Sequence, residues 1–402
     1  MSENDKECDD ILFDDYTNTK IRKCTVDEFL SHITGELNFI FREKNNNKKN
    51  GRGIIVEDAI NAIIFKGIYD GKKVYIKMFG SNIPRQIENF LYEQKIYNYL
   101  QTKDDSIKAI FNDYFIESID TFVIDDMEVV KNILPRVINK HDLENTDTYR
   151  ILDTCFECYF IITLDYELET LYNYLIKPDL SENDFIEIIF ELLYMVYLMN
   201  IRLKIRHNDL HFSNIMIKKL DYENMQEYKI NDKKYRKIKK FKVCVYDYDL
   251  SYSEKIGDNK YIEENFSHIG FKNTINNAKD IWTVVRSLYK DILLDSTRPI
   301  NDIIEQTINL ILKTDDIYKK DTLQTMLFNF QRYNNYRLRY FAEFCNEPKE
   351  PCIEPILPDL HPDQVIERYI STFGLTIGLS ESTPYLQKYL KYKQKYLSLK
   401  NT

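Results

Sequence analysis

A short polar stretch carries the side chains with the clearest chemical potential in this chain of 402 residues. Residues 207–214 read His-Asn-Asp-Leu-His-Phe-Ser-Asn, between a long apolar segment and a short apolar run. A carboxylate can accept and orient an attacking hydroxyl, and an amide oxygen nearby can hold a magnesium ion on phosphate groups. The stretch therefore predicts phosphoryl transfer, with Asp209 at the hydroxyl and Asn214 at the ion.

Other charged side chains lie where predicted elements could bring them to the same place. The apolar run 241–246 predicts a buried strand that ends at Asp247, and a carboxylate there can be the main magnesium ligand. Residues 73–79 alternate as a strand and carry Lys77, whose ammonium can pair with phosphates. An amphipathic helix over 88–100 offers Glu93 as the partner of Lys77, with Glu88 as the alternative.

Composition limits the classes of protein to which the chain can belong. Apolar residues make up 44% and charged residues 30%, as in folded water-soluble domains. The formal charge of −9 argues against a nucleic-acid-binding surface, which needs a basic face. Seven cysteines and an acidic N-terminus without a signal-peptide pattern predict a reducing, cytoplasmic compartment. The most apolar segment, 185–201, contains two glutamates and is too short to cross a bilayer, so no transmembrane segment is expected.

The pattern along the chain predicts an α+β fold in two lobes with extensions. Residues 1–50 are expected to form an N-terminal extension, residues 51–168 a small lobe with a five-stranded antiparallel sheet and one helix, and residues 169–402 a larger, mostly helical lobe. Two helix starts are marked by capping residues, at Thr25 and Ser181. The buried strand that ends near Leu164 marks the boundary between the lobes.

Three further segments are open to more than one interpretation. The lysine-rich run 233–240 predicts a solvated hairpin tip, or else a docking site for phosphate-rich partners. The tyrosine- and lysine-rich helix predicted over 385–397 either packs on the chain or contacts a membrane surface or a partner. Cys155 and Cys158 have no second pair at zinc spacing, which favours buried strand cysteines over a redox or metal site.

Together these motifs resemble the eukaryotic-type protein kinase superfamily over about residues 53–295. The catalytic stretch His207-x-Asp209-Leu210-His211-x-x-Asn214 and the run Asp247-Tyr248-Asp249-Leu250-Ser251 are similar to those of haspin-like kinases. Asp280-x-Trp282 resembles the helix that buttresses the catalytic loop in protein kinases. The composition and the C-terminal tail are similar to proteins of giant DNA viruses, which would place the chain in the host cytoplasm or the virion.

The resemblance implies a bilobal kinase-like fold with ATP and Mg²⁺ in the cleft, and transfer of the ATP γ-phosphoryl group to a Ser or Thr hydroxyl of a protein substrate. Asp209 would orient the hydroxyl, and His211, in the place of a phosphate-contacting lysine, could donate one hydrogen bond as a neutral imidazole. The expected nucleotide-binding residues are Lys77, Glu93, Asn214, Asp247 and, through the backbone of the hinge between the lobes, Asp165 and Tyr166. His207 is expected to hold the loop rather than to carry protons.

Two alternatives remain open. One is a small-molecule kinase of the aminoglycoside or choline kinase type, whose loops also carry Asp-Leu-His-x-x-Asn, although Asp280-x-Trp282 favours the protein-kinase branch. The other is a pseudokinase that serves as a binding scaffold, because the turn at 57–61 lacks the glycine-rich sequence expected over the phosphates. Asn208 replaces the loop arginine that clamps a phosphorylated activation segment, so activation by such phosphorylation is not expected.

Overall fold

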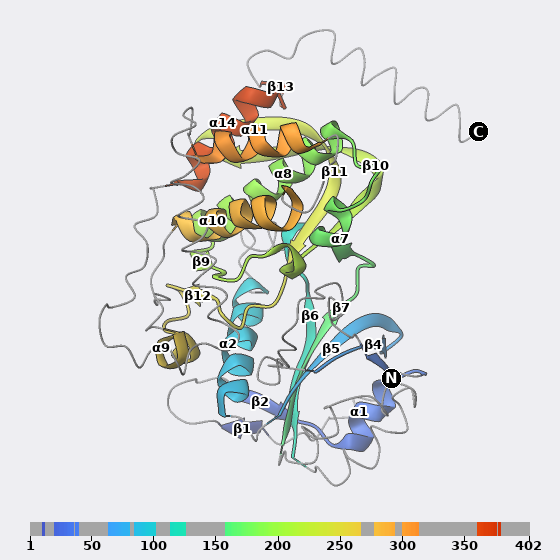
Figure 1. The fold of residues 1–402 in the computed structure, drawn as a ribbon. Helices are drawn as coiled ribbons and strands as arrows, with labels where there is room; N and C mark the ends of the chain where they lie inside the picture. Colours follow the sequence, from blue (N-terminus) through green and yellow to red (C-terminus); the bar gives the residue numbers. More distant parts are fainter. Residues whose placement is uncertain are drawn as a thin grey trace, which may run out of the picture.

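The computed structural model describes residues 10–12, 20–35, 37–39, 63–80, 84–101, 113–125, 157–266, 277–293, 300–312, 360–375 and 377–378. Figure 1 shows a sheet-rich N-terminal region at one end and a helical C-terminal part at the other. The predicted α+β fold class, with a sheet-rich N-terminal region and a mostly helical C-terminal part, is therefore confirmed.

The N-terminal sheet is larger than the sequence predicts. Its strands follow the order β1-β2-β6-β7-β5-β4-β3. They are β1 (Asp10–Leu12), β2 (Lys20–Lys23), β3 (Asn38–Phe39), β4 (Ile63–Tyr69), β5 (Lys72–Gly80), β6 (Ser118–Ile124) and β7 (Cys158–Leu164). The prediction of five strands is wrong because the chain before residue 51 adds β1, β2 and β3, and β2 pairs with β6 in parallel.

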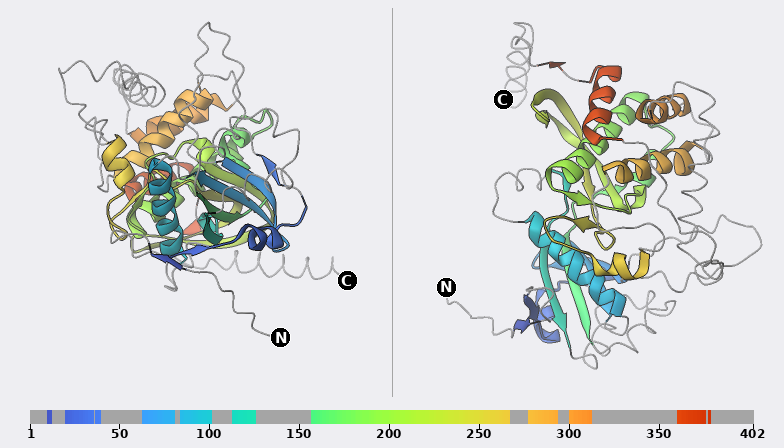
Figure 2. Two further views of the ribbon diagram at one scale, coloured as in Figure 1. Left: turned by 90° about the horizontal axis from the view of Figure 1, so that it is seen from below. Right: turned by 90° about the vertical axis from the view of Figure 1, so that its left-hand side faces the viewer.

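Helices cover both faces of this sheet. Helix α1 (Val26–His32) starts at Thr25, whose side chain accepts a hydrogen bond from the Glu28 amide at 3.1 Å, as the capping pattern predicts. Phe29 of α1 packs against Phe122 and Phe160 on the outer face. Helix α2 (Pro84–Leu100) packs on the inner face (Figure 2). Because strand side chains alternate, Lys77 shares this inner face, whereas its neighbours on β5 face α1.

The C-terminal part is built around a buried helix. Ser181 caps α8 (Glu182–Tyr197), as predicted, by accepting a hydrogen bond from the Asp184 amide at 3.1 Å. The other helical elements are α7 (Leu171–Leu175), η1 (Leu198–Arg202), η2 (Phe212–Asn214), α9 (Lys260–Phe266), α10 (Asn277–Ser287), η4 (Leu288–Leu293), α11 (Asn301–Leu312) and α14 (Pro362–Phe373). No helix in the described part of the chain is both long enough and apolar enough to cross a membrane.

Short and long strands complete this part. The short ones are β8 (Glu169–Thr170), β9 (Ile205–Arg206), β12 (Tyr252–Ser253) and β13 (Ile377–Gly378). The long ones, β10 (Ile215–Ile230) and β11 (Lys233–Val245), form an antiparallel hairpin that packs on α8. One strand of this hairpin, β10, begins directly after the catalytic stretch 207–214, and the other, β11, ends two residues before Asp247. The ends of the hairpin therefore hold these two polar segments near each other, between the sheet and the helices (Figure 1).

The lysine-rich run 233–240 is a solvated hairpin tip only at its start, where Lys233, Lys234 and Arg236 lie beside the turn and are exposed. It forms the first half of β11, and alternate side chains face inward, so that Lys237 is only 3% exposed. Its ammonium pairs with Glu187 and, at 3.3 Å, with Glu191 of α8. Strand periodicity carries Lys239 inward as well, where its ammonium lies 4.3 Å from the centre of the Tyr114 ring. The prediction of a solvated tip is therefore confirmed for the start of the run and wrong for Lys237, because the acids that neutralise Lys237 lie on a distant helix.

Several predicted features fall outside the described residues. They are the loop at 44–51, the strand and turn at 53–61, the polar insertion at 139–150, Cys155, the proline-broken loop at 348–358 and the C-terminal helix at 385–397. Cys158 is buried in β7.

Candidate active site

Lys77 lies at the centre of a buried charge cluster. Strand β5 places it on the inner face of the sheet, where its Nζ lies 2.6 Å from Glu93 Oε2 and 2.6 Å from Asp247 Oδ1. Glu93 comes from α2 and is 1% exposed, and Asp247 follows the end of β11. Two carboxylates from separate parts of the chain thus share one ammonium.

Burial and charge act against each other in this cluster. Burial alone would lower the pKa of Lys77, but the charges of Asp247 and Glu93 outweigh it and the pKa is raised. Burial raises the pKa of Glu93 to about 7; Lys77 pulls it down, and the charge of Asp247 pushes it up. Because negative charge exceeds positive charge, a further cation beside Asp247 would relieve the repulsion between the two carboxylates.

One buried carboxylate holds the backbone at the start of the catalytic stretch. Asp280 of α10 is fully buried and accepts hydrogen bonds from the backbone amides of His207 and Asn208, at 2.9 and 3.0 Å. The same carboxylate accepts a bond from the side chain of Asn200 at 2.8 Å. A buried carboxylate with three donors fixes the backbone around it, so α10 sets the position of the stretch.

His207 links this stretch to the strand that carries Asp247. Its Nε2 lies 2.9 Å from the Tyr246 carbonyl oxygen, and its Nδ1 accepts from the Asp209 amide at 3.3 Å. A neutral ring with the proton on Nε2 satisfies both contacts. His207 therefore positions the loop, which agrees with its predicted role.

Backbone conformation adds to this positioning at Asn208 and Asp247. Both have φ of +68°, in the left-handed region that Asn and Asp tolerate better than most residues. The Asn208 side chain donates to the Leu250 carbonyl at 2.7 Å and accepts from the Arg206 guanidinium. Asn208 thus ties the stretch to the segment after Asp247 by direct hydrogen bonds.

Asp209 and Asn214 face each other across the turn between them. The Asn214 side-chain nitrogen donates to the backbone oxygen of Asp209 at 3.0 Å and to its Oδ2 at 3.3 Å. This leaves Asn214 Oδ1, which is buried, without a hydrogen-bond partner. The Tyr246 amide donates to the Asn214 backbone oxygen at 3.3 Å, so Asn214 lies beside the residue that precedes Asp247.

His211 lies at the edge of this arrangement. Its Nδ1 accepts from the Ser213 amide at 3.2 Å, which caps η2, and its Nε2 lies 3.6 Å from Asp209 Oδ2. The ring thus adjoins the carboxylate of Asp209. With Nδ1 occupied as an acceptor, the neutral ring carries its proton on Nε2.

These residues fit a magnesium ion. A buried amide oxygen without a donor, Asn214 Oδ1, and a carboxylate, Asp247, are oxygen ligands of the kind that Mg²⁺ prefers. Within the described ranges, no three His, Cys, Asp or Glu side chains gather into a metal site. Few protein ligands are typical of Mg²⁺, which takes its other ligands from water and substrate phosphates.

Two backbone groups of the predicted hinge residues bond within the chain. The Asp165 amide donates to the Lys73 carbonyl at 2.9 Å and so extends the β5–β7 pairing. The Tyr166 carbonyl accepts from the Lys218 side chain at 3.1 Å. These two backbone groups already have partners within the chain, because the strand pairing continues one residue past β7 and β10 brings a lysine to the hinge.

Sequence reasoning missed Tyr92, the neighbour of Glu93 on α2. Its hydroxyl donates to the Gly257 carbonyl at 3.0 Å and accepts from the Ser253 amide at 2.9 Å. These bonds join α2 to the segment that follows Asp247. An amphipathic pattern could place Tyr92 on a helix, but no local signal names a partner more than 150 positions away.

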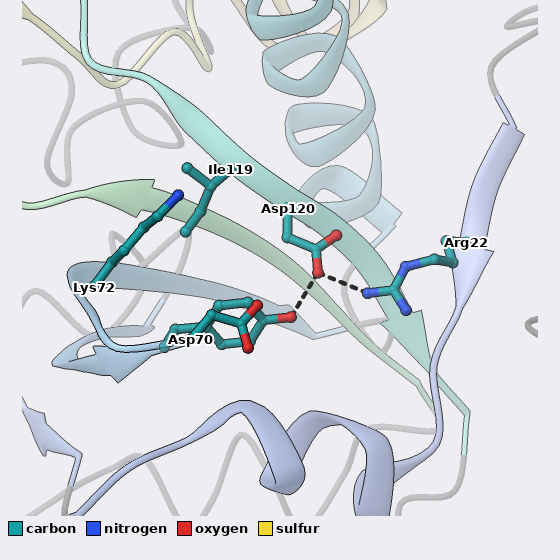
Figure 3. Close-up of a pocket in the computed structure, with 6 residues that line it drawn as sticks. Arg22, Asp70, Lys72, Ile119 and Asp120 are labelled. Carbon is teal, nitrogen blue, oxygen red and sulfur yellow. Dashed lines mark hydrogen bonds and ion pairs between the residues drawn. The ribbon is translucent and has the colours of Figure 1, made fainter. Parts of the chain in front are cut away.

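A hollow of about 280 Å³ lies on the outer face of the sheet (Figure 3). There Arg22 and Tyr69 both donate to Asp120 Oδ2, at 2.7 and 2.6 Å. Tyr69 belongs to the core cluster under α1, on the face opposite Lys77. This hollow is therefore separate from the candidate active site.

Comparisons with known proteins add little about chemistry. No protein-family model matches the sequence, and no curated protein does. Among solved structures, the chain is similar to the crystal structure of PF14_0431, a kinase domain, with 14% sequence identity and a TM-score of 0.34. That match covers 66% of this chain and 67% of the other. The chemistry must therefore be read from the side chains of this chain.

Proposed function

We propose that the chain is a magnesium-dependent phosphotransferase that moves the γ-phosphoryl group of a nucleoside triphosphate to a Ser or Thr hydroxyl of a protein. The observation that carries this proposal is the cluster in which Lys77, fixed by Glu93, meets Asp247. ATP is the donor that the resemblance to protein kinases implies. The haspin-like branch and a viral origin remain predictions from the sequence.

Each side chain has one task in this proposal. Lys77 binds the α- and β-phosphates, and Glu93 keeps its ammonium in place. Asp209 orients the hydroxyl and accepts its proton as the hydroxyl oxygen bonds to the γ-phosphorus and the nucleoside diphosphate leaves. Magnesium, held by Asp247 and Asn214, would supply charge neutralisation on the phosphates. His211 would donate one hydrogen bond to the transferred phosphate from Nε2.

Three features of the geometry support these assignments. Asn214 Oδ1 is a buried acceptor that lacks a donor, which a cation would satisfy. Asp209 is joined to Asn214 by hydrogen bonds, so the hydroxyl and ion positions are adjacent. Asp280 fixes the backbone of the loop, which suits catalysis that depends on positioning.

Autophosphorylation with γ-labelled ATP and Mg²⁺ tests the proposal, with Asp209→Ala as the control. Transfer of label that needs Mg²⁺ and is lost in the variant supports it. If label is transferred only to small hydroxyl compounds offered beside protein acceptors, the chain is a small-molecule kinase. No transfer, together with no thermal shift at millimolar nucleotide with or without Mg²⁺, would indicate a scaffold.

A further inference from the structure

The hairpin of β10 and β11 has two faces with different surroundings. One face packs on α8 and holds the buried side chains of Lys237, Phe241 and Val243. Paired residues of an antiparallel sheet point to the same side, so the register assigns the alternate side chains of both strands to the other face. We call this second face the basic face, because its cations are Lys218, Lys229, Lys234, Arg236, Lys240 and Lys242.

The basic face is most open to solvent near the turn of the hairpin. The side chains of Lys234 and Arg236 are 54% and 52% exposed, and Lys229 on the opposite strand is also exposed. Lys240 and Lys242, further along β11, are partly exposed. Alternate side chains of a strand repeat at about 7 Å, so these positions form a stripe about 27 Å long from Lys234 to Lys242.

The register places like charges directly opposite each other on this face. Lys229 pairs with Lys234, and Lys218 pairs with Lys242. The second pair contacts Tyr166, whose carbonyl and ring carry no net charge. Like charges that face each other across two strands destabilise a sheet, whereas opposite charges stabilise it. The arrangement therefore lowers the stability of the hairpin, and an anionic group lying across the two strands would relieve the repulsion.

One carboxylate is shared by the cations near the turn. The Glu227 carboxylate lies 2.8 Å from the Lys234 ammonium and 3.4 Å from the Arg236 guanidinium. Within the paired part of the hairpin whose side chains the structure describes, this face carries no second acid. The basic face thus keeps an excess of positive charge, in a chain whose formal charge is −9.

An apolar pair lies in the middle of the stripe. Met225 of β10 and Ile238 of β11 face each other across the two strands, and Ile238 stands between Arg236 and Lys240 along its own strand. Met225 is 38% exposed, which is unusual among the large apolar side chains of the described residues. A ligand that matches this face carries acidic groups on both sides of an apolar group.

We propose that the basic face binds an acidic segment of a partner protein, in an extended conformation, with an apolar residue between its acids. Alternate side chains of an extended segment point the same way and repeat at about 7 Å, which is the repeat of the cations along β11. Salt screens exposed charges beyond about 8 Å, so a short segment meets the field of the basic face alone. A long nucleic acid or a charged membrane would also come close to the acidic remainder of the chain.

This proposal does not depend on the proposed function, because binding can be measured without a nucleotide. The first test uses the full-length chain and a labelled peptide of nine residues. The peptide has Asn at the even positions, Leu at the centre and Glu at the other odd positions. Each exposed ion pair contributes modestly, so we expect a Kd below about 100 µM at 0.15 M salt, measured by fluorescence anisotropy.

Three outcomes of this test would overturn the proposal. The first is that the peptide does not bind at millimolar concentration. The second is equal binding of a peptide with the same composition but consecutive glutamates and a terminal Leu, which should bind at least about fivefold more weakly. The third is tighter binding of a single-stranded oligonucleotide or of phosphatidylserine vesicles than of the peptide, which would assign the face to another class of partner.

The second test removes the same charge from each face of the hairpin. Lys229→Gln combined with Lys234→Gln takes two cations from the basic face and should weaken peptide binding at least about fivefold. The matched control combines Lys219→Gln with Lys233→Gln; these lysines are 57% and 61% exposed and pair with acids of α8 and α14 on the other face. The control should change binding by less than about twofold. An equal loss in both variants would overturn the proposal, and if either variant does not fold, the comparison of the two peptides decides.

Discussion

Replacing Asp280 with Asn should weaken the hydrogen bonds that hold the backbone of the catalytic stretch. Asp280 Oδ2 accepts from the His207 amide and from Asn200, and Oδ1 accepts from the Asn208 amide. The amide of an asparagine can keep the two bonds at the Oδ2 position as weaker, neutral ones. Its nitrogen must then face the Asn208 amide, so that two donors meet in a buried place.

The cost follows from these three bonds. One buried donor left unsatisfied costs about 1–3 kcal/mol, and two bonds that change from charged to neutral lose about 0.5–1 kcal/mol each. The neutral asparagine avoids the cost of burying a charge, which offsets part of the lost stability. We expect a net loss of about 2–4 kcal/mol in the free energy of unfolding, which lowers Tm by about 2–5 °C in a chain of this size.

Thermal unfolding and hydrogen exchange together check this prediction. The amides of His207 and Asn208 should exchange much faster in Asp280→Asn, and phosphoryl transfer should fall because Asp209 follows directly. Asp302→Asn, on the exposed first turn of α11, is the matched control and should change stability by less than about 0.5 kcal/mol. Unchanged exchange at His207 and Asn208 would refute the view that Asp280 holds the stretch.

Three further variants probe the same site. Asp247→Asn should abolish magnesium-dependent transfer, yet leave Tm at pH 8 equal or higher, because one of two carboxylates around Lys77 loses its charge; a clearly lower Tm would contradict this. Because the folded chain binds the Glu93 proton more tightly than the unfolded chain, this group stabilises the fold below pH 4.5 and that stability is lost as the pH rises to about 7. Glu93→Gln should remove this slope from melting curves taken across that range, and an unaltered slope would refute it. Tyr92→Phe should cost about 1–3 kcal/mol by leaving the Ser253 amide and the Gly257 carbonyl unpaired, with faster exchange at Ser253 as the readout; exchange as slow as in the wild type would count against it.

Local signals predicted much of the scaffold. The caps at Thr25 and Ser181 and the strands around Lys77 could be read from sequence because each depends on residues only a few positions apart. The α+β fold class could be predicted from the order of these strands and helices along the sequence. The spacing between Asp209 and Asn214 likewise fits a single turn, and the structure joins the two side chains there.

Features that depend on distant partners could not be predicted in this way. Nothing near Lys237 in the sequence shows that Glu187 and Glu191 will neutralise it, so a buried lysine looked like a solvated one. Strand β2 pairs with the nearby β1, but it joins the rest of the sheet only through β6, about a hundred residues further on. At the hinge, the engagement of the Asp165 amide depends on how far β5 and β7 stay paired, which is a matter of register rather than of composition.

The strand order of the N-terminal sheet has a consequence for biosynthesis and for truncated proteins. Strand β7 sits between β6 and β5, so the sheet remains in two pieces until residue 164 has left the ribosome. A protein shortened to begin after residue 39 would lose α1 and bare the aromatic surface formed by Phe65, Phe122 and Phe160. Such a product should aggregate during expression even though every residue of the candidate active site is still present.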